Sequence, residues 1–218
     1  MDNIVIFGSG GHSKVVIDIV EKEGRYNIVG LVDPFQPIGK EVLGYEVIGD
    51  LQDLIEMNET VLGGIVAMGD NWKRYETVKR IQELLPTFYF VKAIHPSAQI
   101  GKNVTIGNGT VVMANTVINS HTSIRDHCII NTKSSIDHDG CLHNFVTIAP
   151  GATLAGSVSI GDHSVISIGA TVIHNRNIGR HTVIGAGSTV LHDIDSYVVA
   201  YGTPAKSIRE RKEGEPYL

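Results

Sequence analysis

The chain has 218 residues, a formal net charge of −5 and 42% hydrophobic residues. This composition fits a globular protein of one or two domains, and an acidic balance without long Lys/Arg runs argues against nucleic acid as a partner. The N-terminus lacks the basic region of a signal peptide and no apolar run is long enough to span a bilayer, so we expect a cytoplasmic protein without membrane insertion. Two cysteines, Cys128 and Cys141, form neither a metal-like pair nor a disulfide framework.

Residues 1–92 alternate apolar runs with amphipathic runs, which predicts a small, Rossmann-like, parallel α/β domain. Strands are expected over 3–7, 28–32, 43–49 (as a pair), 64–68 and 88–91, and helices over 13–22, 50–57 and 72–85. The first helix would bury Val15, Val16, Ile19 and Val20, and Asp50 would cap the second.

A glycine-rich turn, Gly8-Ser9-Gly10-Gly11-His12, separates the first strand from the first helix. Glycine lets backbone N–H groups approach a phosphate, and the helix N-terminus favours an anion. Asp33, at the end of the second strand, stands where dinucleotide-binding folds hold a ribose. Ser13 replaces the third glycine of the dinucleotide motif, which argues against NAD. A plain strand–helix turn remains the alternative.

Every sixth residue from Ile94 to Val190 is Ile, Leu or Val, without an insertion. A period of six fits neither an amphipathic helix nor a long alternating strand. Short strands separated by turns remain, and they predict a parallel β-helix over residues 93–195 with the aliphatic side chains inside. Glycines directly follow several of these positions, where a chain turning a corner needs a small residue. Residues 196–218 are expected to form a tail.

The hexapeptide run resembles the left-handed β-helix family. With Gly8-Ser9-Gly10-Gly11-His12-Ser13-Lys14, Gly69-Asp70-Asn71, Ile94-His95-Pro96-Ser97-Ala98 and Gly202-x-Pro204-Ala205-Lys206, the whole chain resembles one subgroup of hexapeptide-repeat acyltransferases. The subgroup contains the bacillosamine- and perosamine-type nucleotide-sugar N-acetyltransferases and the sialic acid O-acetyltransferase-like proteins. The resemblance implies acetyl-CoA as acyl donor, a UDP- or GDP-linked sugar as acceptor, a homotrimer with sites between adjacent subunits, and no metal.

The resemblance also places the catalytic histidine of the subgroup at His138, as general base. An imidazole suits this role because its pKa lets it take a proton at neutral pH. Asp139 would support the imidazole, and Asp137 is the competitor because adjacent strand residues point to opposite faces. A surface histidine without a role is the alternative. Relatives often carry a second histidine near the acetyl group where this chain has Thr147.

Further site residues follow from the same resemblance. Acetyl-CoA would contact Gly156, Ile168, Gly169, Ala186, Gly187 and Lys206. The Gly156 N–H, one coil beyond His138, would steady the thioester oxygen, and Lys206 would meet a CoA phosphate. On the acceptor side, Gly8, Gly10, Gly11 and His12 would hold the diphosphate, Asp33 the base or ribose, Asn71 the same cleft and Asn119 the sugar.

The resulting hypothesis is acetylation of the 4-amino group of a nucleotide-linked 4-amino-4,6-dideoxy sugar. O-acetylation of a sialic-acid-like or exopolysaccharide sugar is the runner-up. A γ-class carbonic-anhydrase-like zinc site is a remote alternative, since His138 and His143 are five apart, but no third histidine stands in the right column. A catalytically inactive scaffold or sugar-nucleotide sensor is a further alternative.

Overall fold

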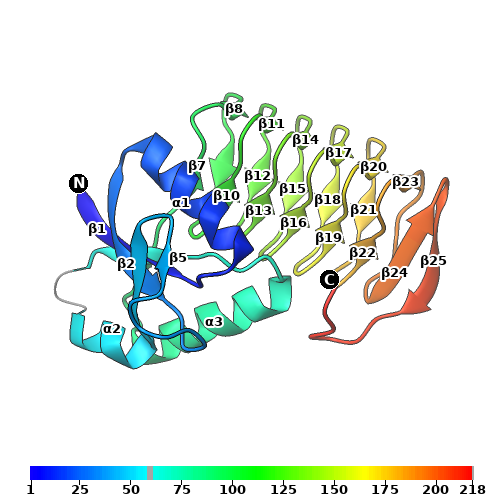
Figure 1. Ribbon diagram of the computed structural model, residues 1–218. Coiled ribbons are helices and arrows are strands. Elements are labelled where there is room, and N and C mark those ends of the chain that lie inside the picture. The colour runs from blue at the N-terminus through cyan, green and yellow to red at the C-terminus, as the bar shows by residue number, and fades with distance from the viewer. Residues whose placement is uncertain (58–60, 218) are drawn as a thin grey trace.

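The structure, a computed structural model, describes residues 1–57 and 61–217. Figure 1 shows two regions side by side, a sheet with helices at the N-terminal end and a column of stacked coils. The expected fold class, a Rossmann-like parallel α/β region followed by a parallel β-helix, is confirmed.

The N-terminal sheet has the strand order β3-β4-β2-β1-β5-β6, parallel except for the β3–β4 pair. Its strands are β1 (Asp2–Phe7), β2 (Tyr26–Val32), β3 (Glu41–Val42), β4 (Tyr45–Gly49), β5 (Gly63–Val66) and β6 (Tyr89–Phe90). The chain winds outward in both directions from β1, so β1 and β5 flank a topological switch point. Open α/β sheets bind ligands in the crevice outside the carboxyl ends of such strands.

Three helices cover this sheet: α1 (Gly11–Glu23), α2 (Leu51–Met57) and α3 (Asn71–Leu84). Asp50 caps α2 as predicted, because its carboxylate accepts hydrogen bonds from the N–H groups of Gln52 and Asp53. The expected inner face of α1 needs correction, since Val15 is exposed and Ile17 is fully buried. The reason is that α1 packs against the β-helix as well as against its own sheet.

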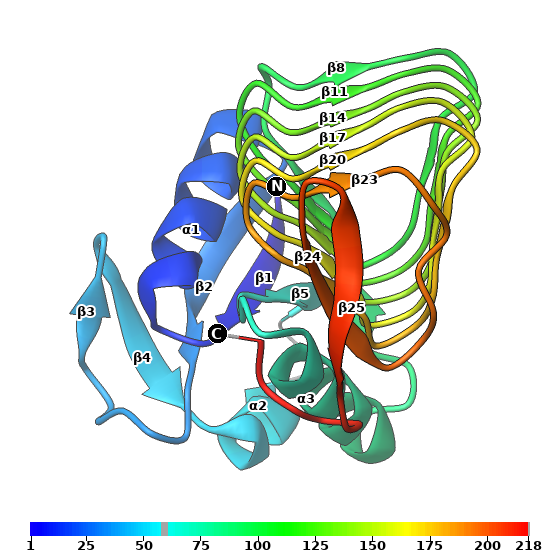
Figure 2. The same cartoon turned by 90° about the vertical axis from the view of Figure 1, so that its right-hand side faces the viewer.

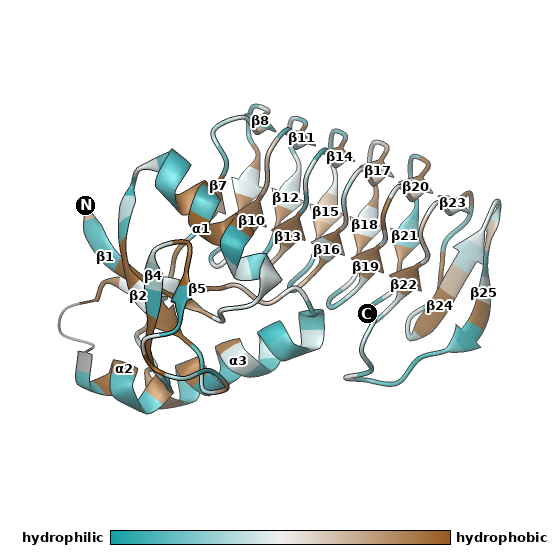
Figure 3. Cartoon of the chain, viewed as in Figure 1, coloured by the Kyte–Doolittle hydropathy of each residue, from teal (hydrophilic) through white to brown (hydrophobic). Residues whose placement is uncertain are grey.

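The β-helix consists of two-residue strands, each paired in parallel with the strand 18 residues further on. One sheet contains β7 (Ala93–Ile94), β10 (Val111–Val112), β13 (Ile129–Ile130), β16 (Thr147–Ile148), β19 (Val165–Ile166) and β22 (Val183–Ile184). A second contains β8 (Gln99–Ile100), β11 (Val117–Ile118), β14 (Ser135–Ile136), β17 (Thr153–Leu154), β20 (Thr171–Val172) and β23 (Thr189–Val190). The third contains β9 (Thr105–Ile106), β12 (Ser123–Ile124), β15 (Cys141–Leu142), β18 (Ser159–Ile160) and β21 (Asn177–Ile178). From Val112 to Val190 the six-residue aliphatic positions form one continuous buried core inside the coils, whereas Ile100 in the first coil is exposed. Hydrophobic segments follow the strands in Figure 3.

The turns of the β-helix require special backbone conformations at a fixed place. Every sixth residue from Asn103 to Gly187 has a positive φ, and most of these residues are not glycine. The glycines after the aliphatic positions have ordinary φ values. They are needed because the coils approach closely: a Cβ on Gly101 would lie 2.6 Å from the backbone nitrogen of Ser120. A small residue is therefore required there, by crowding rather than by φ.

The last part of the described chain is more ordered than a tail. Strand β24 (Val198–Gly202) adds in parallel to β22, and β25 (Ala205–Glu210) pairs with it in an antiparallel hairpin. Ala200 and Ala205 of this hairpin close the end of the β-helix core. Figure 2 shows the chain then running back toward α3. No helix within residues 1–57 and 61–217 is long and apolar enough to cross a membrane.

Candidate functional site

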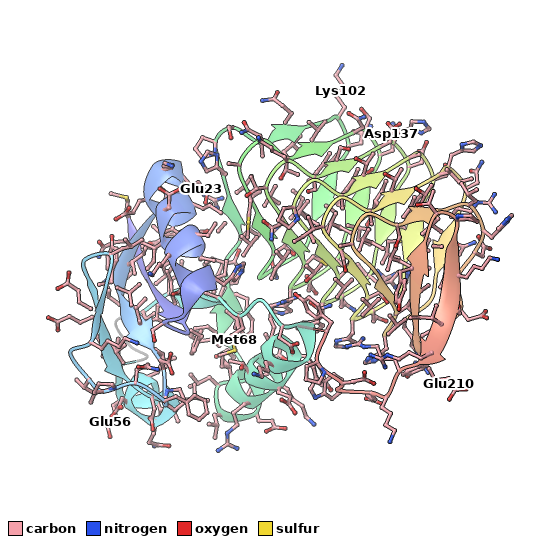
Figure 4. All side chains as sticks on the ribbon, turned by 45° about the vertical axis from the view of Figure 1, so that its right-hand side comes forward. Glu23, Glu56, Met68, Lys102, Asp137 and Glu210 are labelled. Carbon is pink, nitrogen blue, oxygen red and sulfur yellow. The ribbon has the colours of Figure 1, made fainter. Side chains whose placement is uncertain are left out.

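The three edges of the β-helix hold different parts of the candidate site. The turn from β14 to β15 carries Asp137, His138 and Asp139, whereas α3 packs beside the edge at Phe145, between β15 and β16. Figure 4 shows Asp137 at an outer edge of the coils, away from Met68 near the N-terminal sheet. Within one chain, the expected base therefore does not meet the glycine turn.

The His138 imidazole is exposed and held from one side. Its Nδ1 lies 2.8 Å from Oδ2 of Asp139, whose positive φ of 56° belongs to the turn. Asp137 instead accepts hydrogen bonds from the His138 backbone N–H and from the Asn119 side chain, each at 2.8 Å. Of the two carboxylates, Asp139 is the one that orients the ring. The hydrogen bond to Asp139, together with the charge of Asp137, raises the pKa of His138 above its usual value.

Gly156 lies directly under the His138 ring, one coil further along. A Cβ at this position would lie 2.6 Å from Cε1 and 2.7 Å from Nε2 of the imidazole, so any side chain would displace the ring. The Gly156 N–H has no acceptor within residues 1–57 and 61–217. It is thus available to donate to a ligand atom beside the histidine.

The other residues expected to bind acetyl-CoA lie mostly at a different edge. Ile168 and Gly169 form the turn after β19, and Ala186 and Gly187 form the equivalent turn one coil later. All four are exposed, and neither glycine has a neighbour that a Cβ would touch. Lys206 is exposed on β25. Gly156 lies in the turn after β17, so it does not share an edge of the β-helix with Ile168 and Gly169.

The glycine turn forms an open cleft of about 390 Å³ at the N-terminus of α1. Its lining residues are Ser9, Gly10, Gly11, Lys14, Lys40, Glu41, Val42 and Leu43. The sequence analysis missed Lys14 and Lys40, whose ammonium groups suit a diphosphate. The available signals were a lysine at the start of the first helix and another in the loop after Asp33. One carboxylate oxygen of Asp33 is already engaged, because Oδ2 accepts hydrogen bonds from the N–H (3.0 Å) and from the hydroxyl (2.6 Å) of Ser9. This oxygen is therefore not free to bind a ribose.

A buried polar cluster joins the loop after β5 and the start of α3 to the β-helix. Arg74 is 1% exposed and donates to the carbonyls of Met68 and Gly69 on one side and of His127 on the other. Its remaining nitrogen contacts Asn71 at 3.0 Å and the Thr147 hydroxyl at 3.3 Å.

This cluster holds two residues that the sequence analysis singled out, Asn71 and Thr147. Asn71 is 3% exposed and accepts a 2.6 Å hydrogen bond from Thr147, so it fastens the two regions together rather than presenting its amide to an open cleft. Thr147 is buried too, with its hydroxyl committed to Asn71.

His12 differs from the rest of this region because its Nε2 is buried without a hydrogen-bond partner in the described part of the chain. Burial, and then the charge of Arg74, lowers the pKa of His12 to about 4. The ring is therefore neutral at neutral pH.

The zinc alternative gains no support from the geometry. Nδ1 of His138 is engaged by Asp139. Among the residues that the structure describes, no group of three His, Cys, Asp or Glu side chains is arranged to hold a metal.

The fold matches solved enzymes along nearly its whole length. A histidine-to-asparagine variant of perosamine N-acetyltransferase from Caulobacter crescentus, in complex with CoA and GDP-perosamine, has a TM-score of 0.90 and 36% identity, covering 96% of this chain and 98% of that chain. The chain belongs to the bacillosamine- and perosamine-type sugar acetyltransferase family. The acetyltransferase domain of PglB from Neisseria gonorrhoeae FA1090, in complex with acetyl coenzyme A, has a TM-score of 0.87 and 32% identity, covering 95% and 99% of the two chains.

Sequence comparisons agree with this family. The PglD N-terminal domain matches residues 3–81. The UDP-N-acetylbacillosamine N-acetyltransferase of Bacillus subtilis (strain 168) is 34% identical over 117 residues, so the chain spans about half of that relative, 51% of its length.

Proposed function

We propose that the chain is an acetyl-CoA-dependent acetyltransferase that acts on the 4-amino group of a nucleotide-linked 4-amino-4,6-dideoxy sugar. The observation that carries the proposal is His138, an exposed imidazole with Nδ1 held by Asp139 and Nε2 directed over Gly156. Structures of related enzymes contain CoA and GDP-perosamine or acetyl coenzyme A, and two of them are of variants in which a histidine is substituted.

In this proposal His138 is the general base. As the amine nitrogen of the sugar attacks the thioester carbon, Nε2 of His138 takes a proton from that nitrogen. The electron pair of the carbonyl double bond moves onto the oxygen. The free Gly156 N–H is placed to donate to that oxygen. When the carbonyl re-forms, the carbon–sulfur bond breaks, and the proton held on Nε2 balances the thiolate as it leaves as thiol. Asp139 keeps Nδ1 protonated and stabilises the imidazolium while it exists.

The acceptor would be held by a second chain. The glycine turn, with Lys14 and Lys40, offers a cleft for a diphosphate at the start of α1. Asp137, the neighbour of His138 in the sequence, instead lies at an outer edge of the coils (Figure 4). We therefore include a homotrimer in the proposal, with each site formed by His138 of one subunit and the glycine turn of its neighbour. A protein that uses acetyl-CoA works where acetyl-CoA is present, which fits the expected cytoplasmic location.

Thiol release from acetyl-CoA tests the function. Acceptors are GDP- and UDP-linked 4-amino-4,6-dideoxy sugars and their 4-hydroxy counterparts, and the His138→Ala variant is assayed beside the parent protein. The proposal expects release with an amino sugar and a loss of about a hundredfold or more in the variant. Release with hydroxyl acceptors alone would contradict N-acetylation, and equal release by the variant would contradict the role of His138.

A further inference from the structure

The segment after β25, residues 211–217, returns to the N-terminal region instead of leaving the molecule; we name it the C-terminal strap. Arg211 anchors its start by donating to the His181 carbonyl at 3.1 Å. Glu215 closes a turn by accepting from the Lys212 N–H at 3.0 Å and pairing with Arg209 at 2.7 Å. Gly214 lies against the indole of Trp72 on α3, where a Cβ would be 3.0 Å from Nε1. The strap therefore has a defined path across the face of α3.

Tyr217 connects the strap to the polar cluster around Arg74. Its phenol donates a 2.8 Å hydrogen bond to the carbonyl of Gly69, which also accepts from Arg74 at 3.0 Å. Arg74 in turn contacts Asn71 and Thr147. In Figures 1 and 2 the end of the described chain lies beside the loop that precedes α3. Tyr217 is thus part of the same network as the groups between the sheet and the β-helix.

This place borders the crevice at the switch point of the sheet. The loop after β5, which includes Gly69, lies next to the glycine turn, because a Cβ on Gly8 would be 3.4 Å from the Ala67 carbonyl and 3.8 Å from the Met68 side chain. His12 in the same region has a buried Nε2 without a partner within residues 1–57 and 61–217. An unpaired buried nitrogen at a switch-point crevice points to a ligand group there.

The chemistry of the cluster selects what it can bind. Arg74 donates to carbonyls and side-chain oxygens on every side. The Thr147 hydroxyl donates to the side-chain oxygen of Asn71, and the side-chain NH2 of Asn71 donates to the Ser164 carbonyl. The phenol of Tyr217 donates its only hydrogen to Gly69, and the Thr147 hydroxyl is a further hydrogen-bond partner, so the phenolic oxygen keeps one position at which it can accept a bond. Burial raises the pKa of Tyr217, with Arg74 acting in the opposite direction, so the phenol stays neutral at neutral pH. A ligand with hydroxyl or N–H donors fits this oxygen.

We propose that Tyr217 is an acceptor-positioning residue, whose phenolic oxygen accepts a hydrogen bond from the sugar of the bound nucleotide sugar, and that the C-terminal strap forms the wall of this sugar subsite. This inference rests on the proposed function, because it assigns the sugar end of the same acceptor. The nucleotide itself is held by the glycine turn, so Tyr217 distinguishes a nucleotide sugar from the free nucleotide.

Calorimetric binding to the full-length protein tests the proposal with four ligands: GDP, UDP, GDP-perosamine and a UDP-linked 4-amino-4,6-dideoxy sugar. Tyr217→Phe keeps the ring and removes the hydrogen-bonding oxygen, and Tyr89→Phe, on the edge strand β6, is the matched control. The Tyr217 variant should bind the preferred nucleotide sugar about tenfold more weakly, while its affinity for the free nucleotide is unchanged. The KM for acetyl-CoA should not move.

Two results would overturn the assignment. The first is equal affinity of the parent protein and Tyr217→Phe for the nucleotide sugar. The second is an equal loss of affinity for the nucleotide sugar and for the free nucleotide, which would indicate a structural effect of the substitution. A chain ending after Glu210 provides a second measurement and should show the same selective loss if it keeps a cooperative thermal transition. A parent protein that gains no affinity from any attached sugar would contradict both the subsite and the proposed function, whereas a gain that survives in Tyr217→Phe contradicts the subsite alone.

Discussion

Replacement of Gly156 by alanine tests the geometry around His138 most sharply. The new Cβ would lie 2.6 Å from Cε1 of the imidazole, whereas ordinary contacts begin near 3.4 Å. The exposed ring must therefore move by about 1 Å, and a misplacement of this size costs roughly a hundredfold in rate. Because the ring can swing into solvent, we expect little change in the midpoint of thermal unfolding.

The assay is thiol release under saturating acetyl-CoA and amino-sugar acceptor, with kcat and both KM values measured. The His138→Ala background provides the control, because Gly156→Ala should cost almost nothing further once the ring is absent. An unchanged kcat in the single variant would refute the reasoning. An equally large loss in the His138→Ala background would show that Gly156 acts independently of the ring.

Three further outcomes follow from the structure. Asp139→Asn should lower the maximal rate and move the acidic limb of the pH–kcat/KM profile to lower pH, because Asp139 raises the pKa of His138 and the base works only when deprotonated; a limb that stays in place would contradict this pairing. Burial lowers the pKa of His127 from 6.5 to about 4, so stability should fall as pH drops below 6.5 and level off near 4, by about 3 kcal/mol. His127→Phe should flatten that part of the plot of unfolding midpoint against pH, and a curve unchanged by the variant would exclude His127 as its source. Ile148→Ala, at a fully buried position of the coil core, should lose about 3 kcal/mol in urea unfolding, and a loss below 1 kcal/mol would mean that the core relaxes around the gap.

The β-helix was predictable because one position in every six must hold a buried aliphatic side chain. Each aliphatic residue such as Ile136 or Leu154 must point into a narrow core, and the register leaves no other arrangement. The positive φ two residues after the crowded glycine position was not predictable from composition. Lys133 and Phe145 adopt it although neither residue type favours a positive φ.

A column of rings along one edge was also missed. His127, Phe145, His163 and His181 stack at centroid distances of 4.6–5.1 Å, and their 18-residue spacing was the available signal. Single aromatic residues in a repeat look unrelated until three hexapeptides are counted as one coil. The column packs against Trp72 and Tyr75 of α3, so it joins the two regions of the chain.

The candidate site was predicted residue by residue but not as an arrangement. His138, Asp139 and Gly156 come together because their positions follow from the coil register. Burial of Asn71 depends on its contacts with Thr147 and with the Ser164 carbonyl, which are more than 70 residues away along the chain and which no local pattern encodes. The return of Tyr217 to Gly69 spans the whole chain and is likewise absent from any short-range signal.

In the proposed trimer, His138 of one subunit serves the glycine turn of another. This arrangement is tested by mixing two inactive proteins, His138→Ala and a variant in which Lys14 and Lys40 are both replaced by glutamate, after dissociation and reassembly. In randomly mixed trimers about a quarter of the sites would combine an intact base with an intact glycine-turn cleft, so the account predicts recovery of about a quarter of the parent activity. Mixtures that remain as inactive as their components, although ultracentrifugation shows mixed assemblies, would contradict a site shared between subunits.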